Sequence, residues 1–273
     1  VICVKNEEKR IRACIETVQA NNPEEIILVD GGSKDETVKI AESYLNIRII
    51  ISKNSNLTRD RQLGIDNSTN DFVALVDADH RLRPNDLKSL MADMQKYGFD
   101  IVQSGLKSHL NNGFWVSAED QSWQLIQNVP GRRDMIGTAP AIYNKRVFDF
   151  AKFDDHITKT IDDTDFSYRL SKHRGIKMGV GDTVISQDHH SSFLDYLKKF
   201  LWYGKGDGEF CVKNPERTRS MLFHLAIRYP ILYSLKAIMR GKFKAVPFFI
   251  CQGILRLGSL IIQVIKSNLK VVN

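Results

Sequence analysis

Two carboxylates, Asp77 and Asp79, follow an apolar run and are separated by one alanine. Hard oxygen ligands at this spacing suit Mg²⁺ or Mn²⁺, the cations that proteins hold together with a diphosphate. A cation bound there would neutralise negative charge that develops on a departing group. Because Asp is also frequent in turns, a solvated turn after the strand is the competing interpretation.

A second acidic group, residues 162–165, precedes a segment that is expected to be helical as far as Leu170. The positive end of a helix dipole keeps a carboxylate ionised at this position. One of these carboxylates could therefore accept the proton of an attacking hydroxyl group. The alternative is that they only cap the helix.

Two further motifs could contribute to the same chemistry. His189 and His190 follow an expected strand, and since successive strand side chains point to opposite faces, at most one of them should enter a given site. There an imidazole could complete a metal shell, although a surface pair of histidines is the alternative. Asp30 precedes a Gly31-Gly32 turn and could accept hydrogen bonds from a base or a ribose, whereas residues 33–36 resemble a helix capping box.

These motifs lie on a chain in which apolar runs alternate with segments of helical periodicity. The alternation predicts an α/β fold with a mostly parallel central sheet and helices on both faces. Ligands of such sheets bind outside the carboxyl ends of the strands, where Asp30, Asp77 and Asp79 are expected. The expected strands are residues 1–4, 26–29, 47–51, 72–76 and 100–103, and the expected helices are 8–20, 34–45, 57–66 and 84–97.

Beyond residue 103 the pattern is mixed and then helical. We expect strands at 139–143 and 183–185, and loops around 111–113 and 130–131, with residues 108–138 contributing to an acceptor loop. The last part should contain helices at 194–203, 221–239 and 246–265, with a turn at the glycine-rich residues 204–208.

Composition and charge narrow the class of protein. The 273 residues are 42% hydrophobic and 26% charged, which is typical of a globular chain, and four cysteines without a CxxC pair favour reduced thiols. The chain begins inside an apolar run, so we expect a few residues of the first strand to precede it, and no signal peptide is visible.

Residues 193–273 hold 14 Lys and Arg against 4 Asp and Glu, and no acidic residue occurs from Arg217 onward. Such a basic, apolar tail is expected to lie on an anionic membrane surface, and a pair of core helices with a solvated basic face is the alternative.

The motifs occur together and in order, and over residues 1–208 they resemble the inverting family 2 glycosyltransferases of the GT-A fold. The stretches that carry the resemblance are Val4-Lys5-Asn6-Glu7-Glu8, the turn from Asp30 to Thr37, Arg61-Gln62-Leu63-Gly64, Val76-Asp77-Ala78-Asp79, residues 162–170, His189-His190 and Trp202-Tyr203-Gly204-Lys205-Gly206. Residues 209–273 are then expected to form a separate amphipathic helical tail.

The resemblance implies a role for each matching residue. Glu7 and Asp30 would contact the nucleoside of a sugar donor, and Arg61 and Lys205 would offset diphosphate charge. Asp77 would touch the ribose or the metal, and Asp79 would be the main ligand of Mn²⁺ or Mg²⁺. The third metal ligand would be His189, or else His190. Asp163 would be the general base, although Asp162 stays open because the family usually has Glu at that position.

The resemblance also implies the reaction. A sugar would pass from a nucleotide donor to a hydroxyl or phosphate acceptor with inversion of the anomeric configuration, and UDP is expected in the donor more than GDP. The acceptor would be a lipid-linked glycan or a polyprenyl phosphate at the cytoplasmic face of the membrane. One alternative is a catalytically silent GT-A domain that acts as a membrane-bound assembly partner. A nucleic-acid-binding protein is the weaker alternative, because the basic residues are interleaved with aliphatic stretches and match no reading motif, so no nucleic acid is expected as a partner.

Overall fold

The computed structural model describes residues 1–53, 56–110, 113–157, 160–188 and 192–272. The chain divides into two compact units. The first, called the sheet unit here, comprises residues 1–109, 128–156 and 162–188, and the second, the helical unit, comprises 110–127, 157–161 and 189–273. The expected boundary between residues 208 and 209 stays a prediction, and it falls within helix α7 (Phe193–Lys213).

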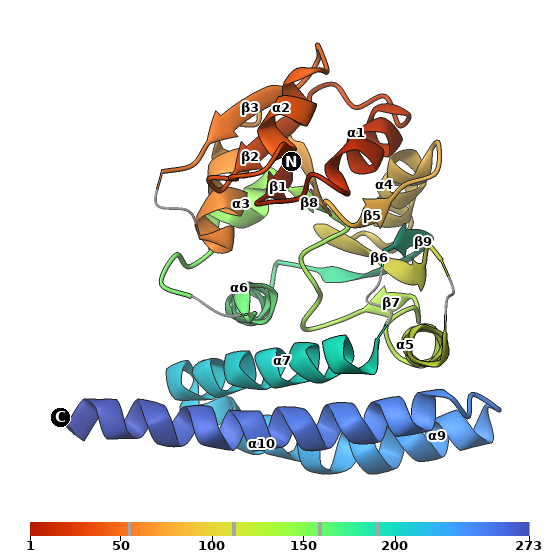
Figure 1. The fold of residues 1–273 in the computed structure, drawn as a ribbon, viewed down its shortest axis with the longest axis vertical. Coiled ribbons are helices and arrows are strands. Elements are labelled where there is room, and N and C mark those ends of the chain that lie inside the picture. The colour runs from red at the N-terminus through yellow and green to blue at the C-terminus, as the bar shows by residue number, and fades with distance from the viewer. Residues whose placement is uncertain (54–55, 111–112, 158–159, 189–191, 273) are drawn as a thin grey trace. The chain divides into compact units, whose positions relative to one another are not determined.

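The described strands of the sheet unit form one nine-stranded sheet (Figure 1). Along the sheet the order is β3 (Arg48–Ile51), β2 (Ile27–Asp30), β1 (Ile2–Val4), β4 (Phe72–Asp77), β8 (Ala141–Asn144), β6 (Ile101–Ser108), β9 (Met178–Gln187) and β5 (His80–Arg81), and β7 (Gly131–Arg132) pairs with β9. The pairs β3–β2, β2–β1, β1–β4 and β6–β9 are parallel, and β8, β5 and β7 pair antiparallel with their neighbours. The predicted α/β class is therefore confirmed, with the parallel part concentrated in the first half of the chain.

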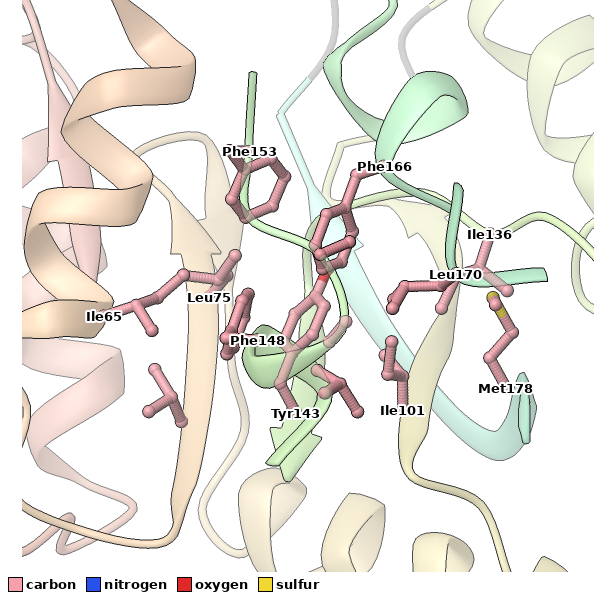
Figure 2. Packing of buried hydrophobic residues seen from close by; sticks show 14 of the residues in the cluster. Ile65, Leu75, Ile101, Ile136, Tyr143, Phe148, Phe153, Phe166, Leu170 and Met178 are labelled. Carbon is pink, nitrogen blue, oxygen red and sulfur yellow. The ribbon is translucent and has the colours of Figure 1, made fainter. Parts of the chain in front are cut away.

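The helices cover both faces of this sheet because its strands bury residues on both sides. Along β4, Val73 and Leu75 join one hydrophobic cluster and Val76 joins another, as the alternation of strand side chains requires. Figure 2 shows the first cluster, in which Phe166 stacks on Phe153 with ring centroids 4.4 Å apart. The helical segments of the unit are α1 (Ile11–Gln19), α2 (Thr37–Glu42), α3 (Leu57–Asp66), α4 (Asp86–Tyr97), η1 (Lys145–Asp149) and α6 (Asp162–Ser171).

The register of the parallel strands places the acidic motifs at one edge. Val4 of β1 lies opposite Asp30 of β2, and Cys3 lies opposite Asp77 of β4. Asp30 and Asp77 are each the last residue of a strand. The expectation that both carboxylates lie at the carboxyl ends of parallel strands is correct, and the two strands flank β1.

The helical unit is built on two long helices, α7 and α10 (Ala245–Val272), which run side by side (Figure 1). Its core joins Ala118 and Leu125 to aromatic residues such as Tyr196 and Phe248. Within the described residues, one helix is long and apolar enough to cross a membrane, over Ala245–Ser267. The remaining elements are α5 (Phe114–Leu125), η2 (Pro215–Arg217), α8 (Thr218–Phe223), the π-helical segment η3 (His224–Tyr233) and α9 (Ser234–Met239).

Two expectations about this unit are wrong. The glycine-rich residues 204–208 form no turn and lie in the middle of α7. A Cβ atom on Gly204 would lie 2.6 Å from Cβ of Ser259, and one on Gly208 would lie 2.7 Å from Cβ of Gln263, so these glycines allow α7 to approach α10 closely. The stretch 108–138, expected as loop, contains helix α5, which buries Val116, Trp123 and Leu125.

Candidate active site

The turn after β4 presents two carboxylates. Asp79 is held in place because its Oδ2 accepts a hydrogen bond of 2.8 Å from Nε2 of Gln187, and its carbonyl oxygen accepts one of 2.8 Å from the backbone N–H of Asp188. Its Oδ1 is buried and has no hydrogen-bond partner in the described part of the chain. A buried carboxylate oxygen without a partner is costly unless a cation completes its environment. The donor set therefore fits a divalent cation.

A third residue at this turn, His80, was not predicted from the sequence. Its side chain is buried, and its Nδ1 accepts a hydrogen bond of 2.9 Å from the backbone N–H of Asp77. Its Nε2 lies 3.8 Å from Oδ1 of Asp79. Side-chain atoms of Asp77, Asp79 and His80 lie within 4.8 Å of one another, close enough to surround one metal ion.

Arg61 of helix α3 joins this turn to helix α6. Its guanidinium is buried and forms ion pairs with Asp77, at 3.1 Å, and with Asp162. Thr138 Oγ1 is a further partner at 3.3 Å. Although burial alone would raise the pKa of Asp77, the charge of Arg61 and its hydrogen bond to this carboxylate outweigh burial and hold that pKa below its ordinary value. The two predicted acidic motifs therefore meet at one guanidinium, although Asp77 and Asp162 are 85 positions apart in the chain.

The two candidate bases at the start of α6 have different surroundings. Asp162 is buried and paired with Arg61. Asp163 is half-buried, and its Oδ1 accepts a hydrogen bond of 2.6 Å from the backbone N–H of Thr164. Both carboxylates lie in the first helical turn, where the helix dipole favours the ionised form.

Asp30 is engaged with its own turn. Its Oδ2 accepts hydrogen bonds from the backbone N–H groups of Gly32, at 2.9 Å, and Ser33, at 3.0 Å, and its Oδ1 accepts one of 2.5 Å from the Ser33 hydroxyl. The predicted capping box is wrong, because α2 begins at Thr37 and its N-cap residue, Glu36, makes no capping hydrogen bond with its side chain, while the Ser33 hydroxyl also accepts the backbone N–H of Asn6. This network fixes the turn in which the nucleoside is expected.

Glu7 contacts the start of α2, which follows this turn, and is close enough to Asp79 to sense its charge. Its backbone N–H donates to Oγ1 of Thr37 at 2.7 Å, and its carboxylate pairs with Arg10 at 3.4 Å. Burial raises the pKa of Glu7, and the negative charge of Asp79 adds to that effect. Glu7 is thus electrostatically coupled to the proposed metal ligands.

The remaining predicted residues cannot be placed in this site. His189 and His190 lie outside the described residues. Lys205 lies on α7 in the helical unit. The sheet unit by itself brings together Asp77, Asp79, Arg61 and the start of α6, and Asp30 ends the strand beside β1.

The comparisons identify the family of the first part of the chain. The family model described as glycosyl transferase family 2 matches residues 1–156. An uncharacterized glycosyltransferase, YibD of Escherichia coli (strain K12), is 29% identical over 147 residues, which are 51% of this chain and 41% of that protein. The undecaprenyl-phosphate 4-deoxy-4-formamido-L-arabinose transferase of Proteus mirabilis (strain HI4320) is 28% identical over 143 residues, 48% of this chain and 44% of that protein. The chain thus spans less than half the length of these curated relatives.

A solved structure shares the fold. Residues 1–349 of S. aureus TarS, crystallised in complex with UDP-GlcNAc, align with a TM-score of 0.55 and 18% sequence identity, covering 96% of this chain and 80% of that one. At this identity the likeness shows the fold alone.

Proposed function

Since the chain belongs to glycosyl transferase family 2, we propose that it transfers a sugar from a nucleoside diphosphate donor to a hydroxyl or phosphate acceptor, with inversion of the anomeric configuration. A UDP-sugar is the preferred donor over a GDP-sugar. The UDP-GlcNAc complex of the structural neighbour supports a UDP donor. The name of the Proteus mirabilis relative supports a polyprenyl phosphate or another lipid-linked acceptor. A catalytically silent domain remains the alternative, and no feature of the site favours it.

One observation carries this proposal: the guanidinium of Arg61 pairs with both Asp77 and Asp162. The proposed cation site and the start of α6 therefore lie close together, on either side of one guanidinium. An inverting transferase needs this proximity, because the base must reach the acceptor while the diphosphate leaves from the opposite side of the anomeric carbon.

Asp163 is the proposed base, with Asp162 as the alternative. The buried ion pair with Arg61 stabilises the charge of Asp162 and makes it a poor proton acceptor. Asp163 follows directly and is half-exposed, so an acceptor hydroxyl can approach it. In the reaction the acceptor oxygen attacks the anomeric carbon and its proton passes to Asp163. The bond from that carbon to the diphosphate oxygen breaks, and the transition state resembles an oxocarbenium ion.

Asp79 and Asp77 are the proposed ligands of Mn²⁺ or Mg²⁺, and His189 or His190 stays the proposal for a further ligand. When bound, the cation supplies the charge that stabilises the departing nucleoside diphosphate. Asp30 and Glu7 are proposed to contact the nucleoside, and the turn built around Asp30 supports this because its backbone is already ordered. Lys205 remains a proposal for the diphosphate, and so does Arg61, whose charge is already balanced by two carboxylates.

The helical unit is proposed to hold the enzyme at the cytoplasmic face of the membrane through residues 217–273. The support is a surface that is both apolar and free of acidic residues: Arg217 to Asn273 contains 10 Lys and Arg and no Asp or Glu. Large aliphatic side chains are exposed at helical spacing on η3, α9 and α10. They include Ile227, Ile231, Leu235, Ile238, Ile250, Ile254, Ile261 and Ile265. An amphipathic arrangement of this kind favours a helix pair lying in the headgroup region.

The test compares two adjacent substitutions. Asp163→Asn should reduce transfer from a UDP-sugar to a lipid-linked glycan with a free hydroxyl group by about a hundredfold or more, while the thermal shift caused by UDP with Mn²⁺ stays near that of the wild type. Asp162→Asn should lower the melting temperature, because Arg61 loses a partner. Wild-type transfer by Asp163→Asn would contradict the assignment of Asp163 as the base. A larger thermal shift with GDP than with UDP would contradict the proposed UDP donor.

A further inference from the structure

His80 combines deep burial with a fixed orientation. Its side chain is 1% exposed, and strand β5, which carries it, pairs with β9 so that His80 lies opposite Gln187. Gln187 in turn donates to Oδ2 of Asp79. The imidazole therefore lies behind the turn that carries both proposed metal ligands, and its neighbours hold it there.

The hydrogen bond to Nδ1 decides what the other ring nitrogen can do. Nδ1 accepts the backbone N–H of Asp77 at 2.9 Å, so its lone pair is occupied. A neutral imidazole carries its one hydrogen on the nitrogen that does not accept, which here is Nε2. A nitrogen that bears hydrogen has no lone pair for a cation. Nε2 also lies 3.8 Å from Oδ1 of Asp79, which is too far for a hydrogen bond.

From this geometry we propose that His80 is a positioning residue for the cation site and not one of its ligands. This inference rests on the proposed function, because that function places a cation at Asp77 and Asp79. By accepting the N–H of Asp77, the imidazole fixes the start of the turn. Gln187 fixes Oδ2 of Asp79 from the other side. Oδ1 of Asp79 is then left available within the turn. Partners of this kind around a metal ligand commonly contribute ten- to a hundredfold to metal affinity.

Two substitutions separate positioning from ligation. In His80→Asn, the amide oxygen can take the place of Nδ1 and accept the N–H of Asp77, but no atom reaches the place of Nε2. In His80→Gln, the longer side chain can reach the place of Nε2 but cannot accept that N–H in the same way. We expect His80→Asn to bind Mn²⁺ about as well as the wild type, and His80→Gln to bind it about tenfold more weakly. The measurement is an EPR titration of the full chain with Mn²⁺ in the presence of UDP.

The opposite order, with His80→Gln near the wild type and His80→Asn much weaker, would show that His80 is a ligand and overturn the proposal. Equal affinities for all three proteins would also overturn it, while leaving the proposed transfer intact. If the wild type binds no Mn²⁺ with UDP, the cation site itself fails, and this inference fails with it. Nitrogen-15 spectra of the wild type give a readout that does not depend on the variants folding: the hydrogen of the His80 ring should stay on Nε2 when Mg²⁺ and UDP are added, and its loss would contradict the proposal.

Discussion

The sheet unit and the helical unit differ in where their carboxylates lie and in which apolar side chains they expose. In the sheet unit, apolar residues fill the interior, and the carboxylates of Asp30, Asp77 and Asp79 lie at or just after the ends of parallel strands. In the helical unit, ion pairs lie inside, between Asp207 and Arg256 and between Glu119 and Lys199, while isoleucines lie on the surface. The first arrangement suits a polar ligand that arrives from water, and the second suits contact with an apolar phase.

The buried Arg61 and the half-buried Arg256 make the contrast concrete. Arg256 meets one carboxylate with two hydrogen bonds of 2.8 Å, so its charge and that of Asp207 balance locally. Arg61 is shared between two carboxylates from different segments. A balanced pair stabilises a fold without inviting a ligand, whereas a site with one guanidinium for two carboxylates keeps an excess of negative charge that a cation can meet.

The strongest test of this difference is to remove each guanidinium. Arg61→Met should lower the free energy of unfolding by about 3–5 kcal/mol, because the buried Asp162 and the partly exposed Asp77 lose their counter-charge, and should also reduce sugar transfer by roughly a hundredfold. Arg256→Met should produce a similar loss of stability, whereas its transfer rate at a temperature where the chain stays folded should fall much less. Urea denaturation and transfer assays measure both. Arg59→Met is the control on the same helix, since Arg59 pairs with Asp155 at the surface and should cost about 1 kcal/mol or less.

The next largest effect concerns the exposed aliphatic surface. Replacing Ile231 and Leu235 of the helical unit together by Glu should weaken binding to anionic vesicles by roughly a hundredfold, which corresponds to about 3 kcal/mol for two side chains that no longer enter the headgroup region. Leu45→Glu is the control, because Leu45 is 99% exposed but lies in the sheet unit. Flotation with vesicles measures both. An equal loss for Leu45→Glu, or none for the double variant, would end the contrast between the units.

Acid should affect the helical unit through His224. Burial, and then the charges of Arg256 and Arg228, lower the pKa of His224 to about 4. The folded chain therefore binds fewer protons than the unfolded chain between about pH 6.5 and 4. The free energy of unfolding should decrease as the pH is lowered through that window, by at most about 3 kcal/mol. His224→Gln should flatten this part of the curve of unfolding free energy against pH. A slope that is unchanged in this variant would assign the acid sensitivity to other groups.

The smallest effect tests the close approach of α7 and α10. Gly204→Ala should cost about 1–3 kcal/mol, because the added carbon has no room beside Ser259. Gly258→Ala on α10 is the matched control, since a Cβ there meets nothing within 4 Å and should stabilise the helix by about 0.5–1 kcal/mol. Thermal unfolding of the two variants should therefore move in opposite directions, and a stabilised Gly204→Ala protein would show that the two helices are not in close contact.

The sequence predicted the parts of the site that follow from local pattern. The bounds of α3 are as expected, and the positions of Asp30 and Asp77 follow from a general rule about parallel sheets. His80 was missed because a buried histidine and a solvated one look alike in a sequence. Its only local signal was its place directly after Asp79. The double pairing of Arg61 joins segments far apart in the chain, and no local pattern can predict it.

The helical unit was harder because packing overrides local preference there. Glycine favours turns, yet Gly204 and Gly208 lie in a continuous helix that another helix touches closely. Their spacing of four residues, which places both on one helix face, was the signal available. Helix α5 was hidden in a stretch with turn-forming residues on either side, although its buried residues Ala118, Ser122 and Leu125 recur at helical spacing.

The lack of carboxylates after Glu216 has a consequence for how the helical unit responds to its surroundings. In the folded chain the stretch holds no group that titrates between about pH 5 and about pH 8, because the pKa of its one histidine, His224, is lowered to about 4, so its positive potential persists over that range. Dissolved ions act on it instead, since a Debye length of about 8 Å at physiological ionic strength is comparable to the size of a side chain. Ionic strength, far more than acidity, therefore sets how firmly this part of the molecule is attracted to a negatively charged surface.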